Sequence, residues 1–234
     1  MKAFLLAAGL GSRLAPITDT TPKCMLAFDG RPLLDIWLDA FSRAGVDEIL
    51  VNLHHLPDVV RDHLEASATP VSVTTFYEPT LLGSAGTLVA NRRWVADDDM
   101  FLACNADNLT DFDLALLVDH HRRHADIATL TVFHSDHPST GGVVELDDSG
   151  RVIGFTEKPA NPVSDLVNAG MYAFDPSVLD EIAAVEPPLD IGFDLLPRLV
   201  GRARALTVDG FFCDVGTPDS YRRAQREWPT RSRL

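Results

Sequence analysis

The sequence predicts an α/β protein with a Rossmann-like, mostly parallel mixed sheet flanked by helices. Three observations lead to this prediction. Strand-like and helix-like segments alternate in the first half, a glycine-rich turn follows the first apolar run, and short strand-like segments succeed one another from about residue 129. Such alternation is typical of a sheet covered on both faces. At 234 residues the chain suits one domain with a sizeable core.

The first half is predicted to open with a strand over Lys2–Ala7. A helix follows over Pro32–Ala44, because proline is favoured at a helix start and Gly45 stands just past its end. The further predicted strands are Glu48–Asn52, Val71–Tyr77 and Met100–Cys104, and the further helices are Leu56–Glu65 and Asp113–His124.

The second half is predicted to be a smaller mixed sheet followed by helices. Its strands are Ala128–Phe133, Gly142–Leu146, Val152–Glu157 and Val167–Phe174, and its helices are Ser177–Ala184 and Phe193–Val200. Neither an internal repeat nor a flexible linker marks a boundary. We therefore expect a single domain over residues 1–234 with two halves, about 1–125 and about 126–234.

Charge and composition restrict the partners of this chain. A net charge of −14 argues against nucleic acid, which most of the surface would repel. No apolar run approaches the roughly 20 residues that span a bilayer, and no signal-peptide pattern follows Met1. The three cysteines form no C-x-x-C pair, which fits reduced, buried thiols. We expect a cytoplasmic protein that binds neither nucleic acid nor a membrane.

The turn after the first strand reads Ala8-Gly9-Leu10-Gly11-Ser12-Arg13-Leu14. Backbone N–H groups in such a turn favour a polyphosphate, and Arg13 and Lys23 can neutralise phosphate oxygens. Leu14 stands where a dinucleotide-binding turn needs a third glycine, and no Gly-Lys-Ser/Thr triplet of a P-loop occurs. The turn therefore predicts a nucleotide-handling enzyme of another kind.

Two aspartates are candidate metal ligands. Asp107 follows an apolar strand, and Asp214 ends the late strand in the run Phe211–Thr217. Because Mg²⁺ prefers oxygen ligands, carboxylates at strand ends suit it. The structural alternative is that both aspartates form turns or cap helices.

The string L-A-A-G-x-G-S-R-L-x-P-x-T, followed by P-K-C-M-L and G-R-P-L-L-D, resembles the signature of sugar-1-phosphate nucleotidyltransferases (NDP-sugar pyrophosphorylases). The resemblance extends over nearly the whole chain. It implies a nucleotidyltransferase (glycosyltransferase-A-like) fold, with a nucleotide-binding half over about 1–125 and a sugar-phosphate-binding half over about 126–234. It also implies an NTP and a sugar 1-phosphate as substrates and Mg²⁺ as cofactor. The oligomeric state is left open between monomer and homodimer.

The same resemblance assigns roles to residues. Asp107 and Asp214 match the metal-binding aspartates, and Arg13 and Lys23 match the residues that hold the triphosphate. Glu157 and Lys158 match an E-K-P motif, where glutamate accepts hydrogen bonds from sugar hydroxyls and lysine meets the sugar's phosphate. The predicted catalytic set is Arg13, Lys23, Asp107, Lys158 and Asp214. Further nucleotide contacts are Leu6, Ala8, Gly9, Gly11, Ser12, Gly83, Ser84 and Gly86, and further sugar-phosphate contacts are Asn108, Gly142, Asn168 and Gly170.

Base recognition is expected at Leu82-Gly83-Ser84-Ala85-Gly86-Thr87. This loop resembles L-G-T-A-G of mannose-1-phosphate guanylyltransferases, with Ser84 where threonine is usual, and therefore favours GTP. It also reads as a helix start capped by Ser84. The alternatives are uridylyl or thymidylyl transfer to a sugar 1-phosphate, cytidylyl transfer to another phosphorylated acceptor, and a non-enzymatic nucleotide-sugar sensor.

Other patterns are interpreted structurally. Successive residues of a strand point to opposite faces, so Glu157 and Lys158 require a kink or a strand end near Pro159. The histidines His54, His55, His120, His121 and His124 are predicted to be packing or solvated residues. Arg222, Arg223, Arg226, Arg231 and Arg233 are predicted to lie on a solvated amphipathic helix and a frayed tail.

Overall fold

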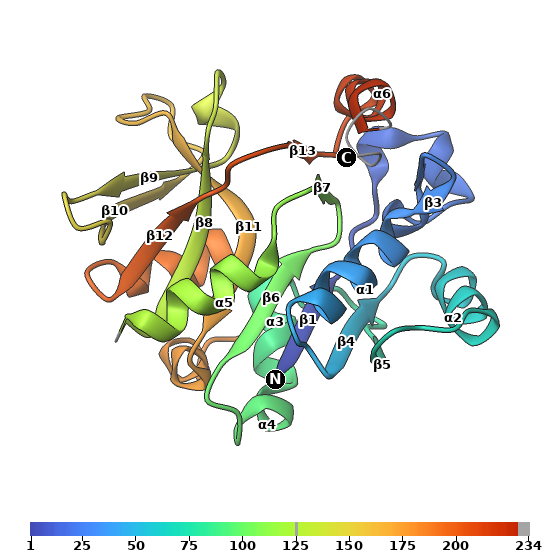
Figure 1. The fold of residues 1–234 in the computed structure, drawn as a ribbon, viewed down its shortest axis with the longest axis horizontal. Coiled ribbons are helices and arrows are strands. Elements are labelled where there is room, and N and C mark those ends of the chain that lie inside the picture. The colour runs from blue at the N-terminus through green and yellow to red at the C-terminus, as the bar shows by residue number, and fades with distance from the viewer. Residues whose placement is uncertain (125, 229–234) are drawn as a thin grey trace. The chain divides into compact units, whose positions relative to one another are not determined.

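The computed structural model describes residues 1–124 and 126–228, and these form two compact units (Figure 1). Each unit is assembled from stretches that are separate in the sequence. Unit 1 comprises the described parts of Met1–Lys2, Leu82–Cys104 and Ala115–Asp209, and unit 2 those of Ala3–Leu81, Asn105–Leu114 and Gly210–Leu234. The predicted functional halves, divided near residue 125, stay a prediction.

Unit 2 is built around β1 (Lys2–Leu6, apart from Lys2), β4 (Glu48–Leu53) and β5 (Ser72–Tyr77), which are neighbours in the sheet. β4 and β5 run parallel. The intervening helices are α1 (Leu33–Arg43) and α2 (Pro57–Ala66), as predicted to within two residues at each end. α1 buries Leu33, Leu34, Trp37, Leu38 and Phe41, a stripe that recurs every three to four residues.

Smaller elements complete unit 2. A short hairpin joins β2 (Ala27–Phe28) to β3 (Arg31–Pro32), and β7 (Asn108–Thr110) pairs antiparallel with β13 (Phe212–Asp214). The remaining segments are the 3₁₀ helices η1 (Ser12–Leu14), η2 (Ile17–Asp19) and η3 (Lys23–Met25) and the helix α6 (Pro218–Glu227). Thr217 and Ser220 cap the start of α6 by reciprocal hydrogen bonds.

Unit 1 contains the mixed part of the sheet. β11 (Leu166–Phe174) runs antiparallel to β6 (Phe101–Asn105), β8 (Ala128–His134) and β9 (Gly142–Leu146). β10 (Val152–Glu157) pairs antiparallel with β9, and β12 (Ala203–Thr207) pairs parallel with β8. The predicted fold class, a mixed sheet flanked by helices, is confirmed, and the change to short strands near residue 129 marks the antiparallel region.

Helices of unit 1 differ from the predictions in two places. Its helical segments are α3 (Ser84–Ala90), α4 (Arg92–Val95), α5 (Leu114–Arg123, apart from Leu114), η4 (Pro138–Thr140), η5 (Pro176–Glu181), η6 (Ile191–Leu195) and η7 (Leu196–Leu199). The predicted helices over Ser177–Ala184 and Phe193–Val200 are wrong as α-helices, because these segments form 3₁₀ and π turns. Pro197 lacks a backbone N–H donor within the second segment, and Pro176 lies at the start of η5 just before the first.

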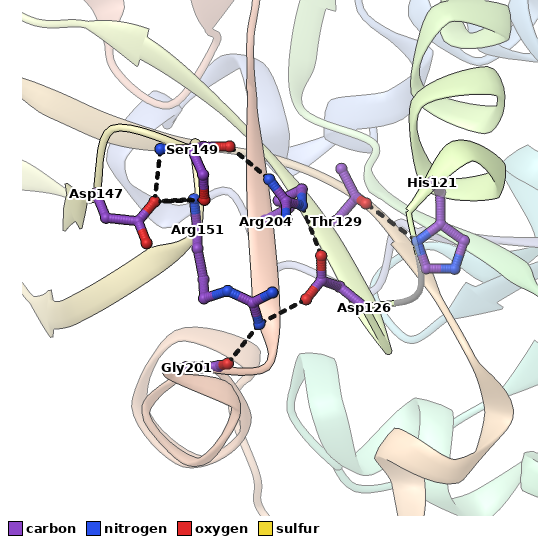
Figure 2. Close-up of polar contacts among 8 residues, drawn as sticks. All are labelled: His121, Asp126, Thr129, Asp147, Ser149, Arg151, Gly201 and Arg204. Atoms are coloured by element: carbon purple, nitrogen blue, oxygen red, sulfur yellow. Dashed lines mark hydrogen bonds and ion pairs between the residues drawn. The ribbon is translucent and has the colours of Figure 1, made fainter.

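A buried carboxylate organises one end of unit 1 (Figure 2). The side chain of Asp126 is 6% exposed; it forms an ion pair with Nη1 of Arg151 at 2.8 Å and accepts a hydrogen bond from Nε of Arg204 at 2.6 Å. Arg204 lies on β12, a strand absent from the predictions because its sequence carries a charged residue among few apolar ones. Two arginines thus offset the desolvation of one buried carboxylate and connect β12 with the turn before β10.

Further predictions concern the three cysteines, possible metal-binding groups, the arginine cluster and membrane spans. All three cysteines are unpaired and buried, as predicted, and burial raises the pKa of Cys24 to about 12. Within the described residues no group of three or more His, Cys, Asp or Glu side chains is arranged to hold a metal. Of the arginine cluster, Arg222, Arg223 and Arg226 lie on α6, whereas Arg231 and Arg233 fall outside the described residues. No helix within the described ranges is long and apolar enough to cross a membrane.

Candidate active site

The glycine-rich turn of unit 2 is held by buried polar groups behind it. The N–H of Ala7 donates to Oδ1 of Asn52 at 2.6 Å, and Nδ2 of Asn52 donates to Oε1 of Glu78 at 2.9 Å. Asn52 lies on β4, and Glu78 directly follows β5. The start of the turn is therefore fixed by the two neighbouring strands.

Gly11 is required by its backbone and by its surroundings. Its φ of +67° lies in the left-handed region, and a Cβ there would lie 2.8 Å from Cγ2 of Thr18 and 2.9 Å from Cγ of Lys23. Thr18 also donates its hydroxyl to the carbonyl of Gly11 at 2.8 Å. The turn thereby lies against the predicted phosphate-binding lysine. Around Gly9 a Cβ would meet nothing within 4 Å, so this part of the turn borders open space.

Lys23 and Asp107 form a direct ion pair. Their Nζ and Oδ2 atoms lie 2.5 Å apart, and the side chains are 12% and 32% exposed. The position of Asp107 follows from the backbone on both sides. Ala106 donates its N–H to the carbonyl of Leu6 at 3.0 Å, and the backbone carbonyl of Asp107 accepts the N–H of Val215 at 2.8 Å.

Asp214 and Arg13 lie close to this pair within unit 2. Asp214 is opposite Asn108 in the β7–β13 ladder, which sets it beside Asp107 in the fold. A Cβ on Gly216 would lie 2.7 Å from Oδ1 of Asp214 and 2.9 Å from Nη2 of Arg13. The glycine of the D-x-G-T motif thus permits the aspartate and the arginine to approach the same backbone.

The two predicted metal ligands, Asp107 and Asp214, fit a Mg²⁺ ion that is bound together with a nucleotide. Asp107 and Asp214 supply two carboxylates from adjoining strand ends. Mg²⁺ commonly takes one or two carboxylates and completes its shell with water and substrate phosphates. Two carboxylates therefore suit a metal that arrives with a nucleotide better than a metal enclosed by protein ligands.

Glu157 and Lys158 form the corresponding feature of unit 1. β10 ends at Glu157 and Lys158 has a φ of +47°, so the predicted strand end is confirmed. Nζ of Lys158 lies 3.7 Å from Oε1 of Glu157, and the lysine side chain is 58% exposed. Burial raises the pKa of Glu157, and the charge of Lys158 opposes that shift.

Gly142 of β9 lies against Glu157, and Asn168 holds an irregular part of β11. A Cβ on Gly142 would lie 2.7 Å from Oε2 of Glu157 and would collide with the ring of Phe155. Asn168 accepts the N–H of Gly170 at 3.0 Å and donates to the hydroxyl of Tyr172 at 2.7 Å. Asn168 therefore stabilises the irregular part of β11, where Gly170 has a φ of +71°.

The predicted base loop contacts a segment that the sequence analysis missed. Gly83, with a φ of +78°, precedes α3, and a Cβ there would collide with the carbonyl of Leu189. That carbonyl accepts the N–H groups of Ala85 and Gly86 at 2.9 and 3.1 Å. The predicted cap by Ser84 is wrong, since α3 begins at Ser84 and no side chain caps it. An Asp-x-Gly turn at 190–192 was the available signal.

The predicted site residues fall into both units. In unit 2 lie Leu6, Ala8, Gly9, Gly11, Ser12, Arg13, Lys23, Asp107, Asn108 and Asp214, and in unit 1 lie Gly83, Ser84, Gly86, Gly142, Glu157, Lys158, Asn168 and Gly170. Within unit 2 the structure brings Lys23 against Asp107 and Arg13 towards Asp214. Within unit 1 it brings Glu157, Lys158 and Gly142 together. The binding roles of these residues stay predictions.

Fold and motifs together define a nucleotidyl transferase, and a family model of that name matches residues 2–231. The chain belongs to the nucleotidyl transferase family, which confirms the resemblance. It is 33% identical to mannose-1-phosphate guanylyltransferase 1 of Arabidopsis thaliana and 34% identical to mannose-1-phosphate guanyltransferase of Emericella nidulans. Both alignments cover 94% of this chain, but only 63% and 62% of the relatives, so the chain spans less than two thirds of their length.

A solved structure supports the fold independently. A crystal structure from Bacillus anthracis, named as a glucose-1-phosphate thymidylyltransferase, superposes with a TM-score of 0.85 at 26% identity. The superposition covers 97% of this chain and 94% of that chain. The predicted nucleotidyltransferase fold is therefore confirmed.

Proposed function

We propose that this protein transfers a nucleotidyl group from an NTP, with GTP favoured, to a sugar 1-phosphate. The observation that carries the proposal is the ion pair of Lys23 and Asp107 beside the glycine-rich turn. In this pair a lysine and a predicted metal-binding carboxylate lie beside the turn that is expected to bind a triphosphate, which supports the proposal. The guanylyltransferase names of the relatives support the same reaction and favour GTP and mannose 1-phosphate.

The reaction balances as an in-line displacement. A phosphate oxygen of the sugar 1-phosphate attacks the α-phosphorus of the NTP, a new P–O bond forms, and the bond to the β-phosphate oxygen breaks. The products are an NDP-sugar and pyrophosphate. Positioning and charge stabilisation provide most of the rate in such transfers.

The residues of unit 2 would bind the triphosphate of the nucleotide. The backbone of the turn and the guanidinium of Arg13 bind triphosphate oxygens, and Lys23 adds a point charge. Asp107 and Asp214 would hold Mg²⁺, whose positive charge offsets that of the crowded phosphates when it is bound. Because Gly11 and Thr18 fix the turn beside Lys23, the cation is oriented before substrate arrives.

The residues of unit 1 would bind the sugar phosphate. The carboxylate of Glu157 accepts hydrogen bonds from sugar hydroxyls, and Lys158 meets the phosphate. The half-exposed ammonium of Lys158 is accessible to a ligand. The left-handed backbone at Lys158 turns its side chain out of the strand alternation, so both residues can face one substrate.

A second base choice has its own support. The solved structure from Bacillus anthracis is named for thymidylyl transfer to glucose 1-phosphate. Thymidylyl transfer is therefore the alternative to guanylyl transfer.

The cytoplasmic location and the choice between monomer and homodimer remain predictions.

Pyrophosphate release measured over a matrix of NTPs and sugar 1-phosphates tests the proposal. Release should require an NTP, a sugar 1-phosphate and Mg²⁺ together. Release from an NTP alone at an unchanged rate, or no release with any pair, would overturn it.

A further inference from the structure

The segment Leu189–Phe193, here called the clamp segment, lies along the base loop Gly83–Gly86 within unit 1. Leu189 donates its N–H to the carbonyl of Leu82 at 2.8 Å, and its own carbonyl accepts the N–H groups of Ala85 and Gly86. Three backbone hydrogen bonds therefore join the two segments. The absence of a side chain at Gly83 permits this approach, because a Cβ would collide with the Leu189 carbonyl.

Side chains extend the same contact. The hydroxyl of Ser84 donates to Oδ2 of Asp190 at 2.9 Å, and its oxygen accepts the N–H of Ile191 at 2.8 Å. A serine hydroxyl has a single donor, so Asp190 uses the donor of Ser84, the polar side chain within Gly83–Gly86. The charged acceptor makes this hydrogen bond stronger than a neutral one.

Asp190 also holds the clamp segment in shape. Its Oδ1 accepts the N–H groups of Gly192 and Phe193 at 2.8 and 3.1 Å. Its own N–H donates to Oδ2 of Asp194 at 2.7 Å. One carboxylate thus connects the base loop to the turn that follows Asp190.

The other end of the clamp segment contacts the predicted sugar-phosphate residues. A Cβ on Gly192 would lie 2.5 Å from Oε2 of Glu157, so only glycine leaves room for that carboxylate in its present position. The ring of Phe193 lies 5.8 Å from Nζ of Lys158, within the range of a cation–π contact, and is 59% exposed. Five consecutive residues therefore touch both predicted substrate-binding features of unit 1.

We propose that Asp190 is a positioning residue, which fixes the base loop and the Glu157–Lys158 pair relative to each other through the clamp segment. This inference rests on the proposed function, because it assigns Asp190 to the use of both substrates. Asp190 needs no contact with either substrate for this role. Its effect arises because it fixes the geometry of the base loop and of the Glu157–Lys158 pair, which are predicted to contact the substrates.

The kinetic test uses Asp190→Ala with Asp175→Ala as a matched control. Asp175 likewise caps a short helix of unit 1, accepting the N–H of Ser177 at 2.8 Å, but it lies outside the clamp. Asp190→Ala should raise KM for both the NTP and the sugar phosphate, and lower kcat/KM by about tenfold or more. Asp175→Ala should leave both constants within about twofold. Unchanged KM values in Asp190→Ala, with only a lower Tm, would overturn the proposal.

Further variants at Ser84 and Gly192 separate positioning from general instability. The loss of kcat/KM in Ser84→Ala combined with Asp190→Ala should be smaller than the sum of the two single losses, because both changes remove the Ser84–Asp190 hydrogen bond, while Ser84→Ala also removes the acceptor of the Ile191 N–H. Additive losses would contradict the coupling. Ser84→Thr, which keeps the hydroxyl, should retain more activity than Ser84→Ala. Gly192→Ala should raise KM for the sugar phosphate more than KM for the NTP, since it displaces Glu157.

Hydrogen exchange provides a readout that does not depend on activity. In ligand-free protein, Asp190→Ala should speed amide exchange at Ala85 and Gly86 and in the peptide that contains Glu157, whereas Asp175→Ala should not. Unchanged exchange at these amides would overturn the positioning role even in an active enzyme. If wild-type protein released no pyrophosphate but exchange behaved as expected, the proposed function would fail while the structural coupling held.

Discussion

Nζ of Lys23 lies 2.5 Å from Oδ2 of Asp107, in a pair of largely shielded side chains. Each partner neutralises the other before substrate is bound. Removal of either one leaves a partly buried charge without its partner, which costs more than the pair itself contributes. For variants at Lys23 or Asp107, the free energy of unfolding should therefore be measured as well as turnover.

The metal assignment predicts the behaviour of two asparagine variants. Asp107→Asn and Asp214→Asn should each lower kcat by orders of magnitude at saturating Mg²⁺, because each removes an anionic ligand. Steady-state pyrophosphate release checks this, with circular dichroism to verify the fold. Asp219→Asn, at a 92% exposed aspartate of the same unit, should behave as wild type. Near-native turnover of either test variant would show that its residue is not a metal ligand.

The two lysines should affect different substrates. Lys23→Ala should chiefly raise KM for the NTP, since Lys23 borders the turn in unit 2, whereas Lys158→Ala should chiefly raise KM for the sugar phosphate. Initial-rate kinetics with each substrate varied in turn provide the measurement. The reverse pattern would mean that the two predicted halves of the site are exchanged.

The pKa of Glu157 predicts a pH dependence of sugar-phosphate use. Burial raises this pKa in the folded protein, so Glu157 takes up a proton at a higher pH than an ordinary glutamate. A protonated carboxyl accepts fewer hydrogen bonds, and KM for the sugar phosphate should therefore rise as pH falls through this raised pKa. Glu157→Gln should lose the part of this rise that Glu157 causes, while titration of the substrate phosphate remains. Identical profiles for the two proteins would contradict the prediction.

The same shift has the opposite sign for stability. A carboxyl whose pKa is raised on folding binds more protons in the folded state than in the unfolded state. Its contribution to the free energy of unfolding is therefore fully present below the ordinary glutamate pKa and declines as pH rises through the raised value. Protonation of Glu157 at low pH is therefore expected to weaken sugar-phosphate binding and, at the same time, to remove the free-energy cost of burying its charge.

Asp126, which is not among the predicted site residues, predicts an effect on stability. Asp126→Ala removes the carboxylate that accepts both Arg151 and Arg204, and Arg204 is only 14% exposed. Loss of one member of a mostly buried ion-pair network should lower the free energy of unfolding by roughly 2–4 kcal/mol. Urea denaturation measures it. The control Asp119→Ala breaks an exposed 3.7 Å pair with Arg123 and should cost less than about 0.5 kcal/mol. Equal costs would contradict a specific role for the buried network.

Local sequence signals predicted the elements that local interactions determine. β9 and β10 match the predicted bounds, and the turn Asp147–Gly150 between them closes with the expected hydrogen bond from Gly150 to Asp147. The end of β10 at Glu157 was also predictable, because Lys158 and Pro159 interrupt the alternation. These features depend on residues that are neighbours in the chain.

Tertiary contacts determine what the sequence analysis missed. The clamp segment reads as the start of a helix near Phe193, yet its conformation is set by hydrogen bonds to residues about a hundred positions earlier. β12 is a strand because it pairs with β8 and because Arg204 forms an ion pair with Asp126. Neither partner can be inferred from a short window of sequence.

The last prediction is that GTP is used in preference to dTTP and UTP. The donor of Ser84 is engaged by Asp190, and the N–H groups of Ala85 and Gly86 are engaged by Leu189. These groups are therefore committed before a base arrives, and the loop determines where the base lies more than it reads the base edge. The preference for guanine rests on the resemblance to L-G-T-A-G and on the names of the relatives.

Discrimination between bases should then be limited. Each polar group left unpaired by a wrong base costs roughly 1–3 kcal/mol. Because few polar groups of the loop are available to the base edge, the preference for GTP should correspond to only one or two such groups. Competition between GTP and dTTP for the best sugar 1-phosphate measures the ratio of kcat/KM values. Asp190→Ala should lower that ratio, because it releases the loop that positions the base. A wild-type ratio in favour of dTTP would place this chain with the thymidylyltransferases and leave the reaction class intact.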